Sequence, residues 1–498
     1  MGSIQRNVIY NVSLSLSQVL FPILIFPYVS RVLGPTQIGE IAFVDSITQW
    51  CTLVAALGIS VYGVREIAKV KHDFKKRSNV FSELLVLHMT ATVLVTIFFV
   101  LSFHTIGSLT TFRNLFWIGA GILFLQSLVI EWLFQGLGAF PYITKRTLAI
   151  RALTTIAIFV CVQGPDDGVI YYSLTFSGIL LNVLVNGWHA RKFVRFHAQG
   201  LHFRKHIRPL LYIFSFAMVT SVYTLLDTVI LGFLADKAEV GYYSTAIRIV
   251  KLVTTLLVAV STVLVASLSF AFHNGRQEEA FALLRKSFAL TVFIGMPLSV
   301  GLGVISHDVI LLFAGEEYLS AAVLLQLLTP TLLVIGLNNV FGMQVLNTTN
   351  NEGLFLKAAL FGMVVSLIAN FLFIPIYRAA GAAIANLLAE LAVCFLLTRF
   401  ALLRYPFRPA WKEMFQAAVA AVPIFGWGIV LKQIPMNRWM ETLTMIILAI
   451  ASYFFIQHAV WKNPLVSELK RIAFTYAGLR KTPLNNLNPS VKNHDIDS

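Results

Sequence analysis

The chain of 498 residues is 57% hydrophobic and only 12% charged, with a mean hydropathy of +0.78. Soluble domains are about 45–50% apolar and about 25% charged, so a water-soluble globule of this size is excluded. The net charge of +15 would indicate nucleic acid only if the basic residues gathered on one soluble face.

Apolar windows between charged or Gly/Pro-rich breaks predict an all-α polytopic membrane protein with about 14 transmembrane helices. The windows lie at 9–30, 38–62, 80–103, 114–136, 147–162, 169–188, 210–234, 242–270, 287–313, 321–346, 358–376, 380–398, 415–431 and 439–461. The first window reaches Arg31 without a small-residue cleavage site, so we expect a retained span rather than a signal peptide.

Most of the 38 Lys and Arg residues fall in alternate connections, counted from the N-terminus, with dense runs at 65–77 and 191–208. This bias follows the positive-inside rule and predicts that both termini are cytoplasmic in a multi-pass protein. Attraction to anionic membrane lipid explains the basic runs beside span ends, so we expect no nucleic-acid partner.

A short pattern at the turn between two spans occurs twice in the chain, about 200 residues apart. It reads Leu33-Gly34, Ile38-Gly39, Phe43 and then Leu231-Gly232, Val240-Gly241, Tyr242. Duplicated six-helix halves are common in transporters, with the substrate site between them. We therefore predict a six-helix lobe over 1–209, a second over 210–414, two additional helices with a juxtamembrane segment over 415–481, and a disordered cytoplasmic tail over 482–498.

Ionisable side chains within spans are costly unless they face a bundle interior or a hydrated cavity. Arg248 and Lys251, three residues apart on one helical face, predict a cationic site for an anionic group such as phosphate. The open alternative is that they pair with Asp227, Asp45 or another carboxylate, or extend to the membrane surface.

Further candidates are assigned by charge. We expect Arg151 and Arg31 to contribute to substrate binding. The carboxylates expected to serve ion coupling or gating are Asp227, Asp45, Glu131 and Glu390. Amides within the spans, among them Gln18, predict either a lumen that hydrogen-bonds sugar hydroxyls or contacts between helices.

Enzyme signatures are missing from the sequence, which contains neither a nucleotide-binding P-loop nor an HExxH motif. The predicted external connections are short, whereas a membrane polymerase or ligase needs a long external loop for catalysis. We expect no catalytic residues, no metal ligands and no cofactor.

Three segments carry a family resemblance: NVSLSLSQVLFPILIFPYVSRVLGPTQIGEIAFVDSI, ALGISVYGVREIAK and LLDTVILGFLADKAEVGYYSTAIRIVKL. In these segments the chain resembles the bacterial Wzx-type oligosaccharide flippases, the O-antigen and polysaccharide exporters. They belong to the multidrug/oligosaccharidyl-lipid/polysaccharide exporter superfamily.

The resemblance implies a function. Such proteins move undecaprenyl-pyrophosphate-linked oligosaccharide from the cytoplasmic to the periplasmic leaflet of the inner membrane by alternating access of two lobes. Coupling to an H+ or Na+ gradient, and partnership with a polysaccharide polymerase and a chain-length regulator, are further implied expectations.

The resemblance also implies a site. Related lipid II flippases place an arginine of the eighth span in a central cationic cavity, and Arg248 is the matching residue here. Those relatives carry further arginines in the first two spans, where this chain has only Gln18 and Asp45 in the membrane interior.

Two alternatives remain open. A multidrug or small-cation antiporter of the same superfamily needs an acidic centre, for which Asp45 gives some support and Arg248 and Lys251 do not. An integral membrane polymerase or ligase is disfavoured by the short external loops.

Overall fold

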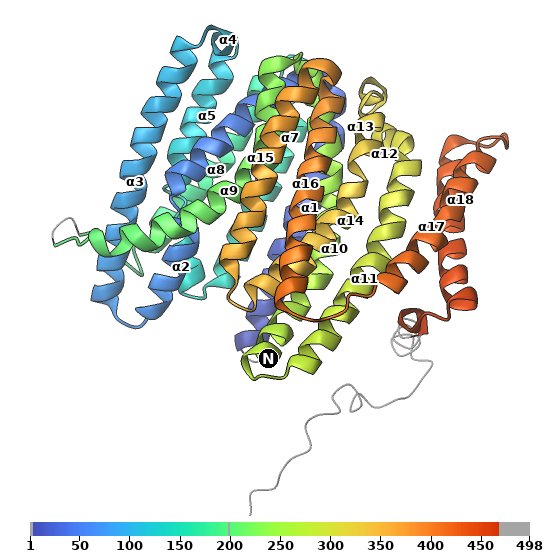
Figure 1. Cartoon of the computed structure of the whole chain (residues 1–498). Helices are drawn as coiled ribbons and strands as arrows, with labels where there is room; N and C mark the ends of the chain where they lie inside the picture. Colours follow the sequence, from blue (N-terminus) through green and yellow to red (C-terminus); the bar gives the residue numbers. More distant parts are fainter. Residues whose placement is uncertain (1–2, 198–199, 468–498) are drawn as a thin grey trace, which may run out of the picture.

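The computed structural model describes residues 3–197 and 200–467. This part of the chain is helical and contains no β-strand, so the all-α prediction is confirmed, and its long helices stand side by side in one bundle (Figure 1). Ten of the described helices are long and apolar enough to cross a membrane. The predicted tail 482–498, and the segment 468–481 before it, lie outside the described residues.

We name the first eight helices, which correspond to the predicted lobe 1–209, the N-lobe. Within it α1 packs against α3, α5 and α7, and α8 packs against α5 and α7. The bounds are α1 Ser3–Ala56, α2 Ile59–Lys69, α3 Phe74–Thr105, α4 Gly107–Thr110, α5 Arg113–Gln126, α6 Glu131–Gly136, α7 Phe140–Cys161 and α8 Gly168–Ala190.

We name the next eight α-helices and two short helical segments, which correspond to the predicted lobe 210–414, the C-lobe. Its tightest pair is α15 with α16, and α15 also packs on α9, while α10 packs on α11 and α13. The bounds are α9 Arg204–Leu234, α10 Lys237–His273, α11 Gln277–Val304, α12 Ser306–Phe313, η1 Glu316–Tyr318, α13 Ala321–Leu328, α14 Pro330–Asn338, η2 Asn339–Asn347, α15 Glu352–Tyr377 and α16 Ala379–Arg404.

Two further helices, α17 (Trp411–Leu431) and α18 (Arg438–Phe455), lie at one edge of the bundle (Figure 1). α17 packs on α11 and α18 packs on α17. The η3 segment (Ile456–Val460) continues α18.

The predicted windows match the helices, with differences at their ends and breaks. Windows 9–30 and 38–62 share α1, which bends at Gly34, where φ is +69° and Pro35 follows. A side chain with a Cβ rarely adopts this φ, so glycine suits the bend. Window 114–136 is split at Ser127–Ile130 between α5 and α6, because Ile130 adopts a left-handed φ of 43°.

The residues that lead into α9 are bound to the N-lobe at the end of the bundle where α3 begins (Figure 1). The buried carboxylate of Glu83 in α3 accepts from His206 Nε2 (2.9 Å), from the backbone N–H of His202 (2.9 Å) and from Lys205. His206 Nδ1 lies 2.9 Å from the Tyr62 hydroxyl of α2. The start of α9 therefore contacts the N-lobe, whereas its later residues pack on α15 of the C-lobe.

The two lobes meet most closely where the twice-occurring glycine turns face each other. A Cβ on Gly39 of α1 would lie 1.7 Å from the carbonyl oxygen of Lys237, and one on Gly241 of α10 would lie 2.0 Å from that of Pro35. The backbones touch, so both positions require glycine. The repeat seen in the sequence thus forms the contact between the lobes on the side where α1 bends at Gly34.

A side chain at this contact should force the lobes apart. We expect Gly39→Ala to destabilise the protein by about 1–3 kcal/mol, as overpacking does, because backbone cannot move aside as a flexible side chain can. The thermal unfolding midpoint of the purified protein measures this. Gly187→Ala in α8 is the matched control, since nothing lies within 4 Å of its added Cβ; equal midpoints for the two variants would contradict the contact.

Candidate functional site

A cavity of about 790 Å³ lies between the lobes, lined by α1, α7 and α8 of the N-lobe and by α9 and α10 of the C-lobe. Pockets of about 300–1,000 Å³ hold ligands of drug size. The cavity is therefore large enough to enclose a polar head group between the lobes.

Among the described residues, three cations line this cavity. Arg248 and Lys251 are one turn apart on α10, and Arg151 comes from α7. The Arg248 guanidinium lies 4.1 Å from the centroid of the Phe26 ring of α1, a cation–π contact between the lobes. Arg151 donates to the Ser17 hydroxyl at 2.7 Å.

No carboxylate of the described residues forms an ion pair with Arg248 or Lys251. The sequence left open whether these cations pair with Asp227 or Asp45, and in the structure they pair with neither. Lys251 is exposed although it lies deep within the bundle, because it borders the cavity. An unpaired charge at this depth is tolerable only where the cavity admits water or an anion.

Asp45 is the single carboxylate among the described residues that line the cavity. It accepts from Gln49 Nε2 at 2.6 Å and lies 3.4 Å from the Tyr172 hydroxyl. Neutral donors, rather than a cation, therefore hold its position.

Asp227 lies apart from the cavity, buried in the C-lobe at 1% exposure. It accepts from four neutral groups on three helices: Asn370 Nδ2 (2.7 Å), Asn386 Nδ2 (2.9 Å), the Tyr243 hydroxyl (3.0 Å) and the Ser366 hydroxyl (3.3 Å). The side-chain oxygen of Asn370 is buried without a hydrogen-bond partner. Neutral donors therefore hold this carboxylate in place, as they do Asp45.

Glu390, one helical turn after Asn386 on α16, is also buried and accepts from Asn338 Nδ2 at 2.7 Å. Asn338 is the last residue of α14, at the point where the helix widens into the π-helical η2 segment. π-Helical segments within spans are frequent at functional sites. The C-lobe thus holds two buried carboxylates whose hydrogen bonds come from neutral side chains.

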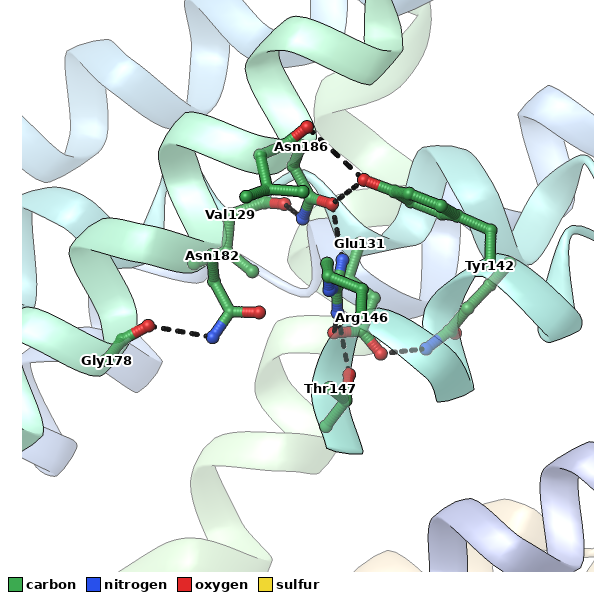
Figure 2. A network of polar contacts seen from close by, with 10 residues as sticks. Val129, Glu131, Tyr142, Arg146, Thr147, Gly178, Asn182 and Asn186 are labelled. Carbon is green, nitrogen blue, oxygen red and sulfur yellow. Dashed lines mark hydrogen bonds and ion pairs between the residues drawn. The ribbon is translucent and has the colours of Figure 1, made fainter. Parts of the chain in front are cut away.

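Glu131 lies in a separate network in the N-lobe (Figure 2). Its carboxylate pairs with Arg146 at 3.1 Å, and Arg146 also donates to the Asn186 side-chain oxygen and to Thr147. Asn186 in turn donates to the carbonyl of Val129, in the break between α5 and α6, at 2.5 Å. The network therefore ties the broken span to α7 and α8.

Arg146 lies just before the predicted window 147–162, but the helix starts earlier than that window. α7 begins at Phe140, with Pro141 in its first turn, so Arg146 lies within the helix and is only 7% exposed. The Tyr142-x3-Arg146 spacing, one helical turn, was the signal that could have placed both side chains on one face.

Arg31 lies away from the cavity, near the glycine contact between the lobes. Its guanidinium donates to the carbonyls of Leu311 (3.4 Å) and Leu312 (2.6 Å) in α12, and Ser30 lies 3.4 Å from the Phe313 carbonyl. These bonds connect the end of the first span with the C-lobe. The structure thus brings Arg248, Lys251, Arg151 and Asp45 together, and places Arg31, Asp227, Glu131 and Glu390 elsewhere.

A family model described as "Polysaccharide biosynthesis protein" matches residues 4–269, more than half of the chain. The chain belongs to this polysaccharide biosynthesis family. The matched part contains the whole N-lobe and the cavity-lining residues of α9 and α10.

Relatives and solved structures extend the match beyond these residues. A protein of Escherichia coli K12 named "Putative O-antigen transporter" is 25% identical over 405 residues, which cover 80% of this chain and 96% of that protein. The lipid II flippase MurJ in an inward closed conformation superposes with a TM-score of 0.71 at 15% identity, covering 92% of this chain and all of MurJ. An inward-facing multidrug transporter of the MATE family gives a TM-score of 0.61 at 14% identity over 80% of this chain and 98% of its own. This member of the polysaccharide biosynthesis family thus has the fold of these transporters.

The ion pair in Figure 2 should be needed for stability. Arg146→Met removes the charged donor of Glu131 and Asn186, which keep only the neutral donors Gln135 and Tyr142. Breaking a buried pair costs about 3–5 kcal/mol. Because Glu131 is about one-third exposed, we expect the lower end of that range. Thermal unfolding measures the loss, with exposed Lys145→Met as control; a midpoint no lower than that of the control would show that the pair contributes nothing.

Proposed function

We propose that this protein is a flippase that moves undecaprenyl-pyrophosphate-linked oligosaccharide from the cytoplasmic to the periplasmic leaflet of the inner membrane, for surface polysaccharide biosynthesis. The observation that carries the proposal is the cavity between the lobes, with three cations and one carboxylate in its lining. Guanidinium and ammonium groups suit phosphate oxygens, and the diphosphate is the charged part of such a substrate.

The comparisons support the same class of activity. The family model concerns polysaccharide biosynthesis, one relative is named as an O-antigen transporter, and MurJ is named as a lipid II flippase. Two of these names describe a transporter or flippase and the third concerns polysaccharide synthesis, so we assign this chain to the transporters and not to the enzymes. A polymerase and a chain-length regulator are the partners expected to use its product.

The physical task is to carry a diphosphate and sugars across a hydrocarbon layer about 30 Å thick that solvates neither. Arg248 and Lys251 would replace the water around the diphosphate, with Arg151 opposite them. The polar side chains of the cavity would do the same for sugars, while the polyprenyl chain remains in lipid.

The lobe contact suggests how access alternates. If the positive-inside bias sets the orientation, Gly34 faces the periplasm, and the Gly39–Gly241 contact and Arg31 close the cavity on that side. We propose that this contact opens when the lobes rock, and that Arg31 stabilises closure rather than binding substrate.

Coupling to an H+ or Na+ gradient is assigned to the C-lobe. Asp227 is buried among neutral donors, and the side-chain oxygen of the neighbouring Asn370 has no hydrogen-bond partner. A proton or cation that binds Asp227 would neutralise its charge, and release would restore that charge. Glu390 is a second candidate on the same helix face as Asn386. Glu131 begins α6 of the broken span, and we assign it a gating role on the basis of its ion pair with Arg146 of α7.

A multidrug antiporter with an acidic centre is disfavoured by the same cavity. Two of its cations, Arg248 and Lys251, have no carboxylate within ion-pair distance among the described residues. A cationic drug would be repelled from this lining.

Removing the cavity cations should abolish export. We expect Arg248→Ala or Lys251→Ala to weaken diphosphate binding about 10- to 100-fold, because each removes a charged hydrogen-bond donor. Surface polysaccharide in a deletion strain that carries each variant measures the loss. Arg276→Ala, which removes an exposed cation just beyond the end of α10, is the matched control; wild-type polysaccharide from both cavity variants at normal expression would refute the site.

The C-lobe carboxylate should control gradient dependence. We expect Asp227→Asn to reduce transport to the rate that the wild type shows without an ion gradient, because the neutral amide neither binds nor releases a proton or cation. Transport into vesicles with and without an H+ or Na+ gradient measures this. Asp236→Asn, at a highly exposed aspartate, is the control, and an Asp227→Asn protein that still responds to the gradient would exclude Asp227 as the coupling group.

A further inference from the structure

Asp45 has no evident use in a cavity that binds only a diphosphate. It lies among the lining residues with Arg151, Arg248 and Lys251, where its negative charge repels phosphate and weakens anion binding. No cation of the described residues forms an ion pair with it. A carboxylate in this position suits a ligand group of a different kind, one that donates hydrogen bonds.

The structure holds this carboxylate firmly. Gln49, one turn later on α1, donates to one oxygen at 2.6 Å, and the Tyr172 hydroxyl of α8 lies 3.4 Å from the other. Each carboxylate oxygen has two lone pairs, so these contacts leave acceptor capacity unused. Asp45 thus presents a fixed hydrogen-bond acceptor to the cavity.

The same wall carries planar amides. Gln18 of α1 and Asn182 of α8 line the cavity together with Gln49. The Asn182 amide nitrogen donates to the Gly178 carbonyl at 2.9 Å, and this bond does not use the side-chain oxygen, which can act as an acceptor. Amides and carboxylates together offer donors and acceptors, which is what a sugar hydroxyl requires and what an ionised phosphate, which only accepts, does not.

The helices that line the cavity differ in chemistry. α10 of the C-lobe carries Arg248 and Lys251, and α7 of the N-lobe carries Arg151, whereas the α1/α8 wall of the N-lobe carries Asp45 and the three amides. A diphosphate joined to a sugar has the same division, with an anionic part next to a hydroxyl-rich part.

We propose that Asp45, together with Gln18, Gln49 and Asn182, binds the sugar attached to the diphosphate and sets which sugars the protein accepts. This inference rests on the proposed function, in which the α10 wall binds the diphosphate. Asp45 accepts hydroxyl protons from the sugar, and its charge favours placement of the diphosphate on the opposite wall. The substrate then bridges the lobes through two different parts of its head group.

The test compares ligands with and without a sugar. The full-length protein in lipid nanodiscs is titrated with farnesyl diphosphate and with farnesyl diphosphates carrying glucose, galactose, N-acetylglucosamine or N-acetylgalactosamine. We expect the wild type to bind at least one glycosylated probe about tenfold more tightly than the bare diphosphate, a difference of about one good hydrogen bond to a charged group. We expect Asp45→Asn and Asn182→Ala to remove that preference.

The outcomes are separable. Affinity for the bare diphosphate should be unchanged in Asn182→Ala and unchanged or tighter in Asp45→Asn, whereas Arg248→Ala should weaken both classes of probe. Gln433→Ala, at an exposed amide between α17 and α18, is the matched control. Asn182→Ala leaves the net charge of the cavity unchanged. It therefore tests sugar binding by the α1/α8 wall even if Asp45→Asn folds poorly.

Two results would overturn the inference: a wild type with no preference for any of the four sugars, or variants that keep the wild-type preference. An Asp45→Asn protein that loses gradient dependence but keeps its sugar preference would instead identify Asp45 as a coupling group. A wild type that binds neither the bare nor the glycosylated diphosphates would count against the proposed function itself.

Discussion

The cost of placing charge within hydrocarbon determines how this bundle is built. Each charged side chain deep in the structure is either compensated or faces the cavity. Glu83 is met by His206 and Lys205, Arg146 by Glu131 and Asn186, and Asp227 by four neutral donors. Arg248 and Lys251 differ because their charge is compensated by no carboxylate among the described residues and the cavity lies beside them. The cost of burying charge, which explains the hydrogen bonds within the lobes, therefore also identifies the site.

The lobes are joined by contacts of opposite kinds at the two ends of the bundle. On one side, glycine backbones of α1 and α10 touch directly, and Arg31 bonds to carbonyls of α12. On the other side, the start of α9 is bound to the N-lobe through Glu83, His206 and Tyr62. When the glycine backbones separate, the exposed Arg31 guanidinium can bond to water in place of the α12 carbonyls, whereas the buried Glu83 network would lose several hydrogen bonds. We infer that opening takes place at the glycine contact and that the α9 anchor persists.

Much of the fold followed from the sequence, because hydropathy directly reports which segments cross a membrane. The windows matched the helices, and the Leu-Gly repeat marked turns that meet in space. The breaks were not predictable: the left-handed Ile130 interrupts an apolar run whose composition does not change. Arg248 and Lys251 were found because cations in an apolar run are conspicuous. Arg146 was missed because it lies near a predicted span end, where charge position alone indicates topology, and the pairing of Asp227 with neutral groups depends on helices more than a hundred residues apart.

Transport by the purified protein tests the central claim most directly. In liposomes that contain a fluorescent polyprenyl diphosphate-linked saccharide, the wild type should move the lipid between leaflets, as shown by its exposure to a membrane-impermeant quencher. The Arg248→Ala/Lys251→Ala double variant should leave the lipid at the rate of protein-free liposomes. A wild type that fails to move this lipid, or a double variant that moves it as fast as the wild type, would contradict the account.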